Sequence, residues 1–407
     1  MKILVAQSMS YFGLGGASKA NRAVIEGLAR RGHSCTVLSV ESHRDTAAQG
    51  FRVVGAHLPP VLKRGGVKIF AAASDWEQAA FLPRLRRAFG PDWTLVSDTG
   101  VLLLTTALEN DPAGVVMLAH STITNLPTGS ADEIKESIRA LLGRAAGIIT
   151  VSGYMREYVR EWSGLDSTVI HFPSYGPGPF KRFDNFEGGY VTMINPCGYK
   201  GISIFTALAR NLPQVKFAAV PTWGTAPEDR AALARLPNVT MLEPSSDVDD
   251  IFARTKVLLT PSLWGEAFGQ VVVEAMLRGI PVLASNAGGL PEAKLGVDYV
   301  LPVRMIERYE WDGENRVRPV IPEQDVRPWT ETLSRVIADR ALYEQLSAAS
   351  REAATAFVAS LGPLPFERYL EQLTAVGNRP GVGDHAVPLI ASAATTRHAQ
   401  GSAPPLL

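Results

Sequence analysis

Two glutamates eight positions apart, Glu266 and Glu274, are the side chains of this sequence best placed to act on one ligand together. Helical periodicity predicts a helix over 268–278, and the backbone N–H groups at its start have no partner inside the helix. With the helix dipole they make an anion site, and Gly269, which has no Cβ, would let a phosphate come close to the backbone. Glu274 lies about 7 Å farther along the helix. A diphosphate at the helix start would therefore have a carboxylate on each side, one for a ribose and one for a sugar, which is the outline of a nucleotide sugar.

A strand–helix–strand unit positions these residues. The apolar run 256–260 predicts a strand that leads into a loop over 261–267, and 282–285 predicts a second strand directly after the helix. Gly279 stands where a glycine commonly ends a helix, and Pro281 prevents the helix from continuing. Such a unit implies parallel pairing in a buried sheet.

Each glutamate has an ordinary explanation by itself. A glutamate before a helix is favoured by the helix dipole, and one inside a helix is usually a solvated surface residue. The whole string is harder to explain in that way, because Phe268, Gly269 and Gln270 follow the first glutamate and a G-G-x-P-E turn, 288–292, follows one strand later. This pattern resembles the retaining glycosyltransferases of the group 1, or family 4, type. The resemblance implies the GT-B fold, an α/β fold in which two Rossmann-like domains with doubly wound parallel sheets face a central cleft.

The resemblance also implies roles for residues of the second half. Glu274 would bind the ribose, and Glu266 would be a catalytic residue that holds the sugar hydroxyls. Lys200, followed by glycine, matches the family's K-G pair, whose lysine neutralises the donor diphosphate. Residues 194–196 stand where the family often carries an arginine, so a second cation is missing from its usual place. The diphosphate must therefore be bound differently from the family's usual way, or by backbone amides at the helix start. Those amides belong to Phe268, Gly269 and Gln270.

A glycine-rich loop follows the first strand of the chain. The sequence predicts a strand over 2–7, a helix over 17–31 and a strand over 35–40, the opening of a Rossmann-like domain. A dinucleotide fingerprint would place its third glycine where Ser18 stands. Glu41 lies near the distance expected for a ribose-binding acid, so an NAD-dependent dehydrogenase stays an alternative. The resemblance implies instead that two adjacent glycines of this loop approach the donor phosphates and the acceptor. They are Gly15 and Gly16.

Three further residues stand just after predicted strands. His120 follows the strand predicted over 115–119, at the carboxyl end where parallel sheets bind ligands. The family has a histidine here that contacts the donor sugar, and the resemblance implies that catalytic role for His120; a structural histidine is the competing interpretation. Glu243 and Pro244 follow the strand predicted over 239–242, and the resemblance implies that they lie near the base of the nucleotide.

The composition limits the classes of protein. The 407 residues are enough for two α/β domains, and 46% hydrophobic with 20% charged residues is ordinary for a soluble globular protein. Forty basic and forty acidic residues give a net charge of zero, so we expect no nucleic acid partner. Two cysteines, Cys35 and Cys197, suit a reducing cytoplasm, and no apolar run reaches the length of a membrane span. The opening MKILVAQS is interpreted as a first strand rather than a signal peptide.

A segment rich in proline and glycine, 173–189, separates the two halves. We predict an N-terminal acceptor-side domain over 1–175 and a C-terminal donor-binding domain over 186–358. A final helix within 360–376 is expected to cross back to the first domain, and 377–407 is expected to be disordered. Three further helices are predicted over 329–337, 340–348 and 351–357.

The sequence therefore predicts a retaining, metal-independent hexosyltransferase. It would move a sugar from a nucleoside diphosphate sugar, with a UDP-sugar favoured, to a hydroxyl of a small-molecule or glycan acceptor. No bound metal or cofactor is expected, because the family needs none and we recognise no D-x-D metal motif. Two alternatives remain: a nucleotide-sugar epimerase of the same fold, which would release a free epimerised sugar, and a non-catalytic nucleotide-binding protein. The sequence specifies neither the sugar, nor the acceptor, nor the oligomeric state.

Overall fold

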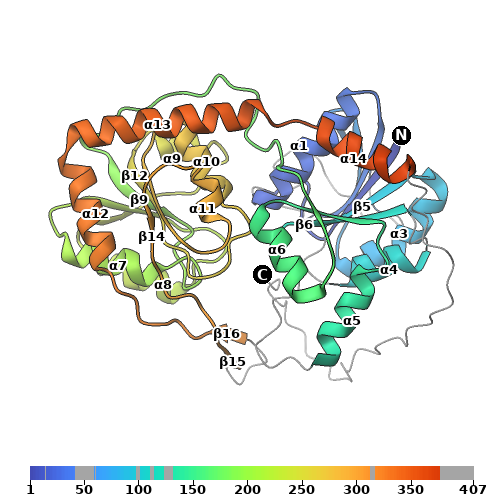
Figure 1. Cartoon of the computed structure of the whole chain (residues 1–407), viewed down its shortest axis with the longest axis horizontal. Coiled ribbons are helices and arrows are strands. Elements are labelled where there is room, and N and C mark those ends of the chain that lie inside the picture. The colour runs from blue at the N-terminus through green and yellow to red at the C-terminus, as the bar shows by residue number, and fades with distance from the viewer. Residues whose placement is uncertain are drawn as a thin grey trace.

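The computed structural model describes residues 1–13, 15–41, 59, 61–97, 101–110, 114–122, 132–311 and 317–375. The tail predicted to be disordered, 377–407, lies outside the described residues. Two α/β halves lie side by side, each built on its own sheet (Figure 1). The predicted fold class, an α/β protein with two Rossmann-like parallel sheets, is confirmed.

The first sheet is built from β1 (Lys2–Gln7), β2 (Ser34–Val40), β3 (Val61–Arg64), β4 (Val67–Ala72), β5 (Trp93–Ser97), β6 (Val115–Ala119), β7 (Gly147–Thr150) and β8 (Thr168–Val169). The strands lie in the order β3-β4-β2-β1-β5-β6-β7-β8, and all neighbours are parallel except β3 and β4. The order reverses between β1 and β5. Open parallel sheets bind ligands beyond the carboxyl ends of strands at such a reversal, and the glycine loop of this chain follows β1.

The second sheet is built from β9 (Tyr190–Ile194), β10 (Phe217–Val220), β11 (Val239–Met241), β12 (Thr255–Thr260), β13 (Val282–Ser285) and β14 (Val300–Leu301). All neighbours are parallel, in the order β11-β10-β9-β12-β13-β14. Here the order reverses between β9 and β12. Lys200 follows β9 and Glu266 follows β12, so the topology alone brings these two residues to the same edge of the sheet.

Helices cover both sheets. In the first half they are α1 (Gly16–Arg30), α3 (Asp75–Phe89), α4 (Leu102–Asn110), α5 (Asp132–Leu142) and α6 (Gly153–Ser163). The second half holds α7 (Ile202–Asn211), α8 (Pro227–Ala234), α9 (Asp249–Phe252), α10 (Gln270–Leu277), α11 (Leu290–Ala293), α12 (Arg327–Ala338) and α13 (Arg340–Ala359). The last helix is α14 (Leu364–Ala375), and a two-stranded ribbon, β15 (Tyr309–Trp311) with β16 (Val317–Pro319), projects from the second half (Figure 1).

Burial on both faces explains why the central strands are almost wholly apolar. Every residue of β5 and of β6 is buried, as expected of parallel strands covered by helices on each side. The apolar core of the first half continues through Phe172 and Phe268 to residues of α10, so the halves share packed side chains. A separate core around Phe205, Phe217 and Trp329 fills the other side of the second sheet.

The chain ends by returning to the first half. α13 lies along one edge of the second half, and α14 then packs beside α1 (Figure 1). Glu367 of α14 pairs with Arg31 at 2.5 Å and with His33 at 3.1 Å. The Phe366 ring lies 4.8 Å from that of Phe172, centroid to centroid, in an edge-on contact. The last described helix therefore packs on the first half.

Predicted helix boundaries are shifted by one or two residues at α1, α10 and α12, and a predicted break within α13 is absent. α10 begins at Gln270 rather than 268, because Gly269 has a left-handed conformation with φ of +102° and serves as the N-cap. Its end is as predicted, with Gly279 at φ of +72°. The helices predicted over 340–348 and 351–357 are one continuous helix, α13. No proline or glycine interrupts that segment, and Ser350, which lies at the predicted break, is buried in the helix.

Candidate active site

Glu266 lies in the loop between β12 and α10 and is almost fully enclosed. Its Oε1 atom accepts hydrogen bonds from Ser262 Oγ at 2.5 Å and from Trp264 Nε1 at 3.0 Å, and it forms an ion pair with Lys200. Burial opposes ionisation, but the Lys200 charge and the hydrogen bonds from Lys200, Ser262 and Trp264 outweigh it and hold the pKa of Glu266 below its usual value. The side chain is therefore a carboxylate at neutral pH, held in one orientation by its neighbours.

Lys200 reaches Glu266 because two loops meet edge to edge. Leu263 N–H, in the loop of Glu266, donates a hydrogen bond of 2.8 Å to the carbonyl of Tyr199. Gly201 has φ of +81°, and a Cβ placed there would lie 2.0 Å from the carbonyl oxygen of Pro261. Only glycine permits this approach, so the K-G pair is set by packing as well as by chemistry.

The G-G-x-P-E turn supports the same loop from the other side. Gly289 N–H donates to the Glu266 carbonyl at 2.7 Å, and a Cβ on Gly288 would lie 2.3 Å from Glu266 N. Glu292 then accepts a hydrogen bond of 2.8 Å from Gly153 N–H, at the start of α6, and lies 3.4 Å from His171 Nε2. This turn therefore links the loop of Glu266 to the first half.

Gly269 has a reason to be glycine that the sequence did not reveal. A Cβ at this position would lie 2.6 Å from Leu290 Cδ2, and the left-handed φ disfavours any other residue. The close neighbour is thus a leucine of α11. The phosphate approach predicted for Gly269 from its missing Cβ stays a prediction.

Three helix starts near this loop lack side-chain caps. α1, α7 and α10 each have a glycine as N-cap, without a capping side chain, and none carries an acidic residue in its first turn. Their N-cap residues are Gly15, Gly201 and Gly269. Uncapped first-turn amides and the dipole attract anions.

The two halves meet at the starts of α1 and α10. Lys19 Nζ lies 3.6 Å from Glu274 Oε1, and Gln270 Nε2 donates to the Gly16 carbonyl at 3.4 Å. A Cβ on Gly16 would lie 3.4 Å from Gln270 Oε1, whereas one on Gly15 would meet nothing within 4 Å. The structure thus brings Gly16, Gln270 and Glu274 together across the two halves, as their predicted roles require.

His120 stands at the end of β6 with contacts in the first half. Its Nε2 atom lies 2.7 Å from Asn21 Oδ1, and its ring lies 4.6 Å from that of Phe172. Because Oδ1 is an acceptor, Nε2 carries the proton in this contact. Burial lowers the pKa of His120 to about 4, so the ring is neutral at pH 7. With its single N–H given to Asn21, the neutral ring can offer a sugar hydroxyl only its acceptor nitrogen, Nδ1. The catalytic and the structural interpretation of His120 both stay predictions.

Glu243 and Pro244 are exposed and lie just beyond β11, after Leu242. β11 is the edge strand of the second sheet and is separated from β12 by β10 and β9. Their predicted place beside the nucleotide base stays a prediction.

Glu41 has partners that explain it without a ribose. It is buried and accepts hydrogen bonds from Ser10 Oγ at 2.6 Å, Tyr11 N at 2.5 Å and Ser39 Oγ at 2.7 Å. The carboxylate therefore holds the loop after β1 in place. This engagement weighs against the dinucleotide alternative, in which the same oxygens would bind ribose hydroxyls.

Sequence reasoning missed Lys19 and Asn21, both on α1. Asn21 orients His120 and donates to Gln7 Oε1 at 3.1 Å. Lys19 lies one helical turn after Gly16, and that spacing could have drawn attention to it. The sequence does not show which residues of α1 lie toward the second half of the molecule.

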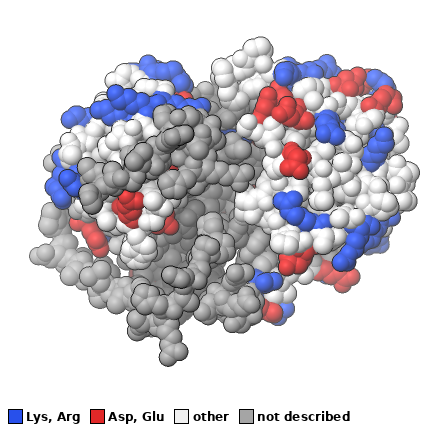
Figure 2. Space-filling model, turned by 180° about the vertical axis from the view of Figure 1, so that it is seen from behind, with Lys and Arg blue, Asp and Glu red and all other residues white. Residues whose placement is uncertain are grey.

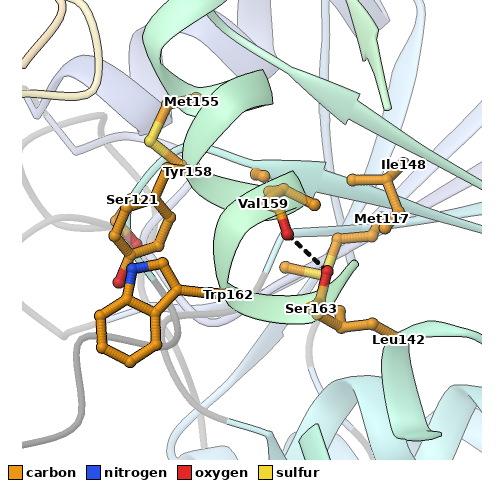
Figure 3. A pocket seen from close by; sticks show the side chains of 10 residues that line it. Met117, Ser121, Leu142, Ile148, Met155, Tyr158, Val159, Trp162 and Ser163 are labelled. Atoms are coloured by element: carbon orange, nitrogen blue, oxygen red, sulfur yellow. Dashed lines mark hydrogen bonds between the residues drawn. The ribbon is translucent and has the colours of Figure 1, made fainter. Parts of the chain in front are cut away.

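A pocket lies in the first half, between β6, β7, α5 and α6 (Figure 3). Tyr158 and Trp162 of α6 form part of its wall, and Tyr154, one turn earlier, continues the same row, with ring centroids 6.3 and 5.7 Å apart. Tyr154 also contacts the loop of Glu266, since a Cβ on Gly265 would lie 2.0 Å from its hydroxyl. An aromatic row therefore runs from that loop to an apolar pocket. The remaining lining residues are Met117, Ala119, Ser121, Leu142, Ile148, Met155, Val159 and Ser163.

The expectation that no D-x-D string occurs was wrong, because Asp247-Val248-Asp249 has that spacing. Asp249 is engaged elsewhere, however, with Arg278 at 2.7 Å and Lys181 at 3.3 Å. Among the described residues no group of three or more His, Cys, Asp and Glu could hold a metal ion.

The described helices include none with the length and apolarity to cross a membrane. On the face drawn in Figure 2, acidic and basic side chains are intermixed over the half that holds the second sheet.

Comparisons with known families match both halves of the chain. The family described as Glycosyltransferase Family 4 matches residues 14–172, and the family described as Glycosyl transferases group 1 matches residues 202–294. Together these segments cover more than half of the chain, and they include both glycine-loop residues, His120 and both glutamates; Lys200 lies just before the second segment. The chain belongs to the group 1, family 4 type of glycosyltransferases, whose activity is sugar transfer.

Curated relatives are distant. An exopolysaccharide phosphotransferase of Streptomyces coelicolor is 28% identical over 143 residues, which are 35% of this chain and 13% of that protein. An uncharacterised 42.6 kDa protein of the cps region of Klebsiella pneumoniae is 23% identical over 333 residues, covering 72% of this chain and 87% of that protein. The chain thus spans only a small part of the first of these relatives.

Solved structures share the whole fold. Sucrose-phosphate synthase from Thermosynechococcus elongatus aligns with a TM-score of 0.66 and 17% identity over 92% of this chain and all of that chain. Anabaena HepE, solved in complex with UDP and glucose, aligns with a TM-score of 0.65 and 16% identity, again over 92% of this chain and all of that one. These similarities establish the GT-B fold for the described chain.

Proposed function

We propose that the protein is a retaining glycosyltransferase that moves a sugar from a UDP-sugar to a hydroxyl of a small-molecule or glycan acceptor. The observation that carries this proposal is the Lys200–Glu266 pair, which lies between the uncapped starts of α7 and α10. It unites a cation, a fixed carboxylate and free amides at the place where the order of the second sheet reverses.

The donor would lie along α10. Its diphosphate would take the amides of Phe268, Gly269 and Gln270, and Glu274, about 7 Å farther along the helix, would accept hydrogen bonds from the ribose. Lys200 would stabilise the negative charge that develops on the leaving diphosphate, and prearranged donors of this kind are a large part of catalysis. Glu266 would hold the sugar hydroxyls with its second oxygen, Oε2, because Oε1 already accepts three hydrogen bonds.

The choice of UDP has support from a relative of the same fold. Anabaena HepE has been solved with UDP, with UDP-glucose, and with UDP and glucose. Those ligands belong to that protein, whose identity with this chain is 15 to 17%. Uracil is therefore the first base to test here, followed by guanine and adenine.

We propose retention of configuration because the resemblance to the group 1, family 4 glycosyltransferases implies it. Glu266 is held by three donors and its pKa is lowered, which suits hydrogen bonding better than nucleophilic attack. The acceptor would then attack the face that the diphosphate leaves, with a phosphate oxygen taking its proton. The helix amides and Lys200 supply the positive charge that a metal would otherwise bring, so we propose that transfer needs none. Full activity in EDTA and an unchanged anomeric configuration by NMR are the expected results.

The first half would bind the acceptor. The aromatic row from Tyr154 to Trp162 starts beside the loop of Glu266, so an acceptor could place its hydroxyl near the donor and its less polar part along the row. The pocket at the far end of the row (Figure 3) has a volume of about 20 Å³ and is too small to hold an acceptor itself. Cys35 and Cys197 are buried free thiols, which supports a cytoplasmic location.

The test is calorimetric titration of UDP, GDP, ADP and NAD against the protein and its Glu274→Ala variant. We expect one nucleoside diphosphate to bind, and the variant to bind it more than tenfold more weakly, which corresponds to about 1.4 kcal/mol. Glu352→Ala, at an exposed glutamate of α13, is the matched control. Binding of NAD alone, or equal binding by parent and variant, would contradict the proposal.

The same samples separate the remaining alternatives. An epimerase would convert the donor without an acceptor and release a free epimerised sugar, which chromatography detects. A non-catalytic binding protein would bind the nucleoside diphosphate and leave every donor sugar intact in the presence of acceptor mixtures.

A further inference from the structure

We infer that Lys19 is the second cation of the donor site, supplied by the first half of the molecule. In the structure Lys19 is paired with Glu274, the proposed ribose ligand, and on donor binding it would move to the diphosphate. The inference rests on the proposed function, because it adds a residue to that donor site.

The contact itself places Lys19 where a donor would lie. Its Nζ atom is 3.6 Å from Glu274 Oε1, and the side chains are 22% and 13% exposed. Next to this pair, Gln270 at the start of α10 meets Gly16 at the start of α1. A ribose that binds Glu274 must therefore enter beside Lys19.

The strength of the contact permits exchange. A charge-assisted hydrogen bond between an ammonium and a carboxylate is about 2.7–2.9 Å long, so a separation of 3.6 Å marks a looser ion pair. Lysine carries a compact charge on a flexible stem of four carbons. When ribose hydroxyls occupy Glu274, the ammonium can turn along α10 toward the amides at its start.

The balance of charge gives the reason for this movement. Lys200 is already paired with Glu266, and Lys19 with Glu274, so these four side chains sum to zero. Without Lys19 the same group would carry one net negative charge and would face a diphosphate. The family's arginine is absent here, since Ile194, Asn195 and Pro196 occupy its place. Lys19 restores the missing positive charge from the opposite half.

This arrangement gives ligands of different charge opposite responses. UDP needs Lys19 for its diphosphate, whereas uridine has no phosphate and must only displace Lys19 from Glu274. Removing the ammonium should therefore weaken UDP and strengthen uridine. A residue that merely stabilises the fold would weaken both.

The experiment is calorimetric titration of UDP and of uridine against the parent protein and its Lys19→Met variant at low and moderate salt. We expect the variant to bind UDP at least tenfold more weakly, with a shallower dependence on salt, and to bind uridine more tightly than the parent does. Lys19→Arg should keep most of the UDP affinity. Lys216→Met, at an exposed lysine of the second half, is the control for removal of one positive charge.

The possible outcomes distinguish failure of the Lys19 inference from failure of the proposed glycosyltransferase function. If the parent binds no nucleoside diphosphate, the proposed function fails and the inference falls with it. If the parent binds UDP and Lys19→Met binds it equally well, the inference is overturned while the function stands. A parallel loss of UDP and uridine would also overturn it, in favour of a structural role. Circular dichroism checks folding, and Lys19→Gln replaces Lys19→Met if that variant does not fold.

Discussion

Three helix starts at the proposed donor site differ from three capped helix starts of the molecule, while α9, α11 and α12 also lack a side-chain cap. α3, α6 and α13 are capped by Ser74, Ser152 and Asp339, whose side chains accept hydrogen bonds from first-turn amides. α1, α7 and α10 have glycine N-caps, without a capping side chain and without an acidic residue in the first turn. The first group satisfies its amides within the protein, whereas the second leaves them for another partner.

The contrast shows how an anion site can be built without many cations. A glycine N-cap is less stabilising than a Ser or Asp N-cap by only a few tenths of a kcal/mol, so three glycine N-caps at one place leave their first-turn amides open at little cost in stability. Glycine N-caps also let backbones approach closely, as Gly201 approaches Pro261 and Gly269 approaches Leu290. The cations that accompany them, Lys200 and Lys19, come from different halves.

The largest expected effect is on the free energy of unfolding, and it should differ between two of the glycine N-caps, Gly201 and Gly15. Gly201→Ala should lower the free energy of unfolding by about 3 kcal/mol or more, because the new Cβ would overlap the Pro261 carbonyl at a left-handed φ. Gly15→Ala should lower it by less than about 1 kcal/mol, because nothing lies within 4 Å and its φ is −63°. Urea unfolding followed by circular dichroism measures both. Equal effects would mean that the glycine N-caps are not distinguished by packing.

Lys294 contrasts with the paired lysines of the donor site. It is 1% exposed, its ammonium donates to the Val282 carbonyl at 2.6 Å, and burial lowers its pKa to about 7 against a weaker opposing effect of Asp298. The unfolded chain, with a pKa near 10.5, binds more protons between pH 7 and 10, so stability should rise with pH in that window.

Replacement of Lys294 should remove that pH dependence. We expect Lys294→Met to be more stable than the parent at pH 7 and its advantage to shrink by about 2 kcal/mol by pH 9. Urea unfolding at both pH values measures the difference, with the exposed Lys216→Met as control. A constant difference across this window would show that Lys294 does not titrate there.

An acid at an uncapped start should have opposite effects on binding and stability. Gln270→Glu adds a carboxylate to the first turn of α10, which the dipole favours by about 0.3–1 kcal/mol. The same charge would repel a diphosphate, so UDP affinity should fall about tenfold, or about 1.4 kcal/mol. Calorimetry and urea unfolding on one preparation test this pair of effects. If UDP affinity is unchanged, the diphosphate does not bind at the start of α10.

The smallest expected effect concerns the capped starts. Ser74→Ala and Asp339→Ala should each lower the free energy of unfolding by about 1 kcal/mol, since each removes a cap from a first-turn amide. UDP affinity should not change, because these caps serve only the fold. A loss of UDP binding in either variant would contradict the division between the two groups of helix starts.

Much of the second half could be predicted because its signals are local. The run from β12 to β13 follows from apolar strands, a helical period, and the pair Gly279 and Pro281, all within 30 residues. The start of α10 was misplaced by two residues because the left-handed conformation of Gly269 depends on Leu290, which packs against it from α11. The break predicted within α13 failed because burial of Ser350 is a tertiary property.

The sequence by itself determined the family, the two Rossmann-like sheets, and the residue types that a donor site needs. The tertiary structure alone decided which of these residues meet: Lys200 with Glu266, Lys19 with Glu274, and Glu292 with the start of α6. The physical reason is range. Periodicity and capping act over a few residues and leave a mark in the sequence, whereas these contacts join segments 66 or more residues apart, whose distance is fixed only when strands and helices pack.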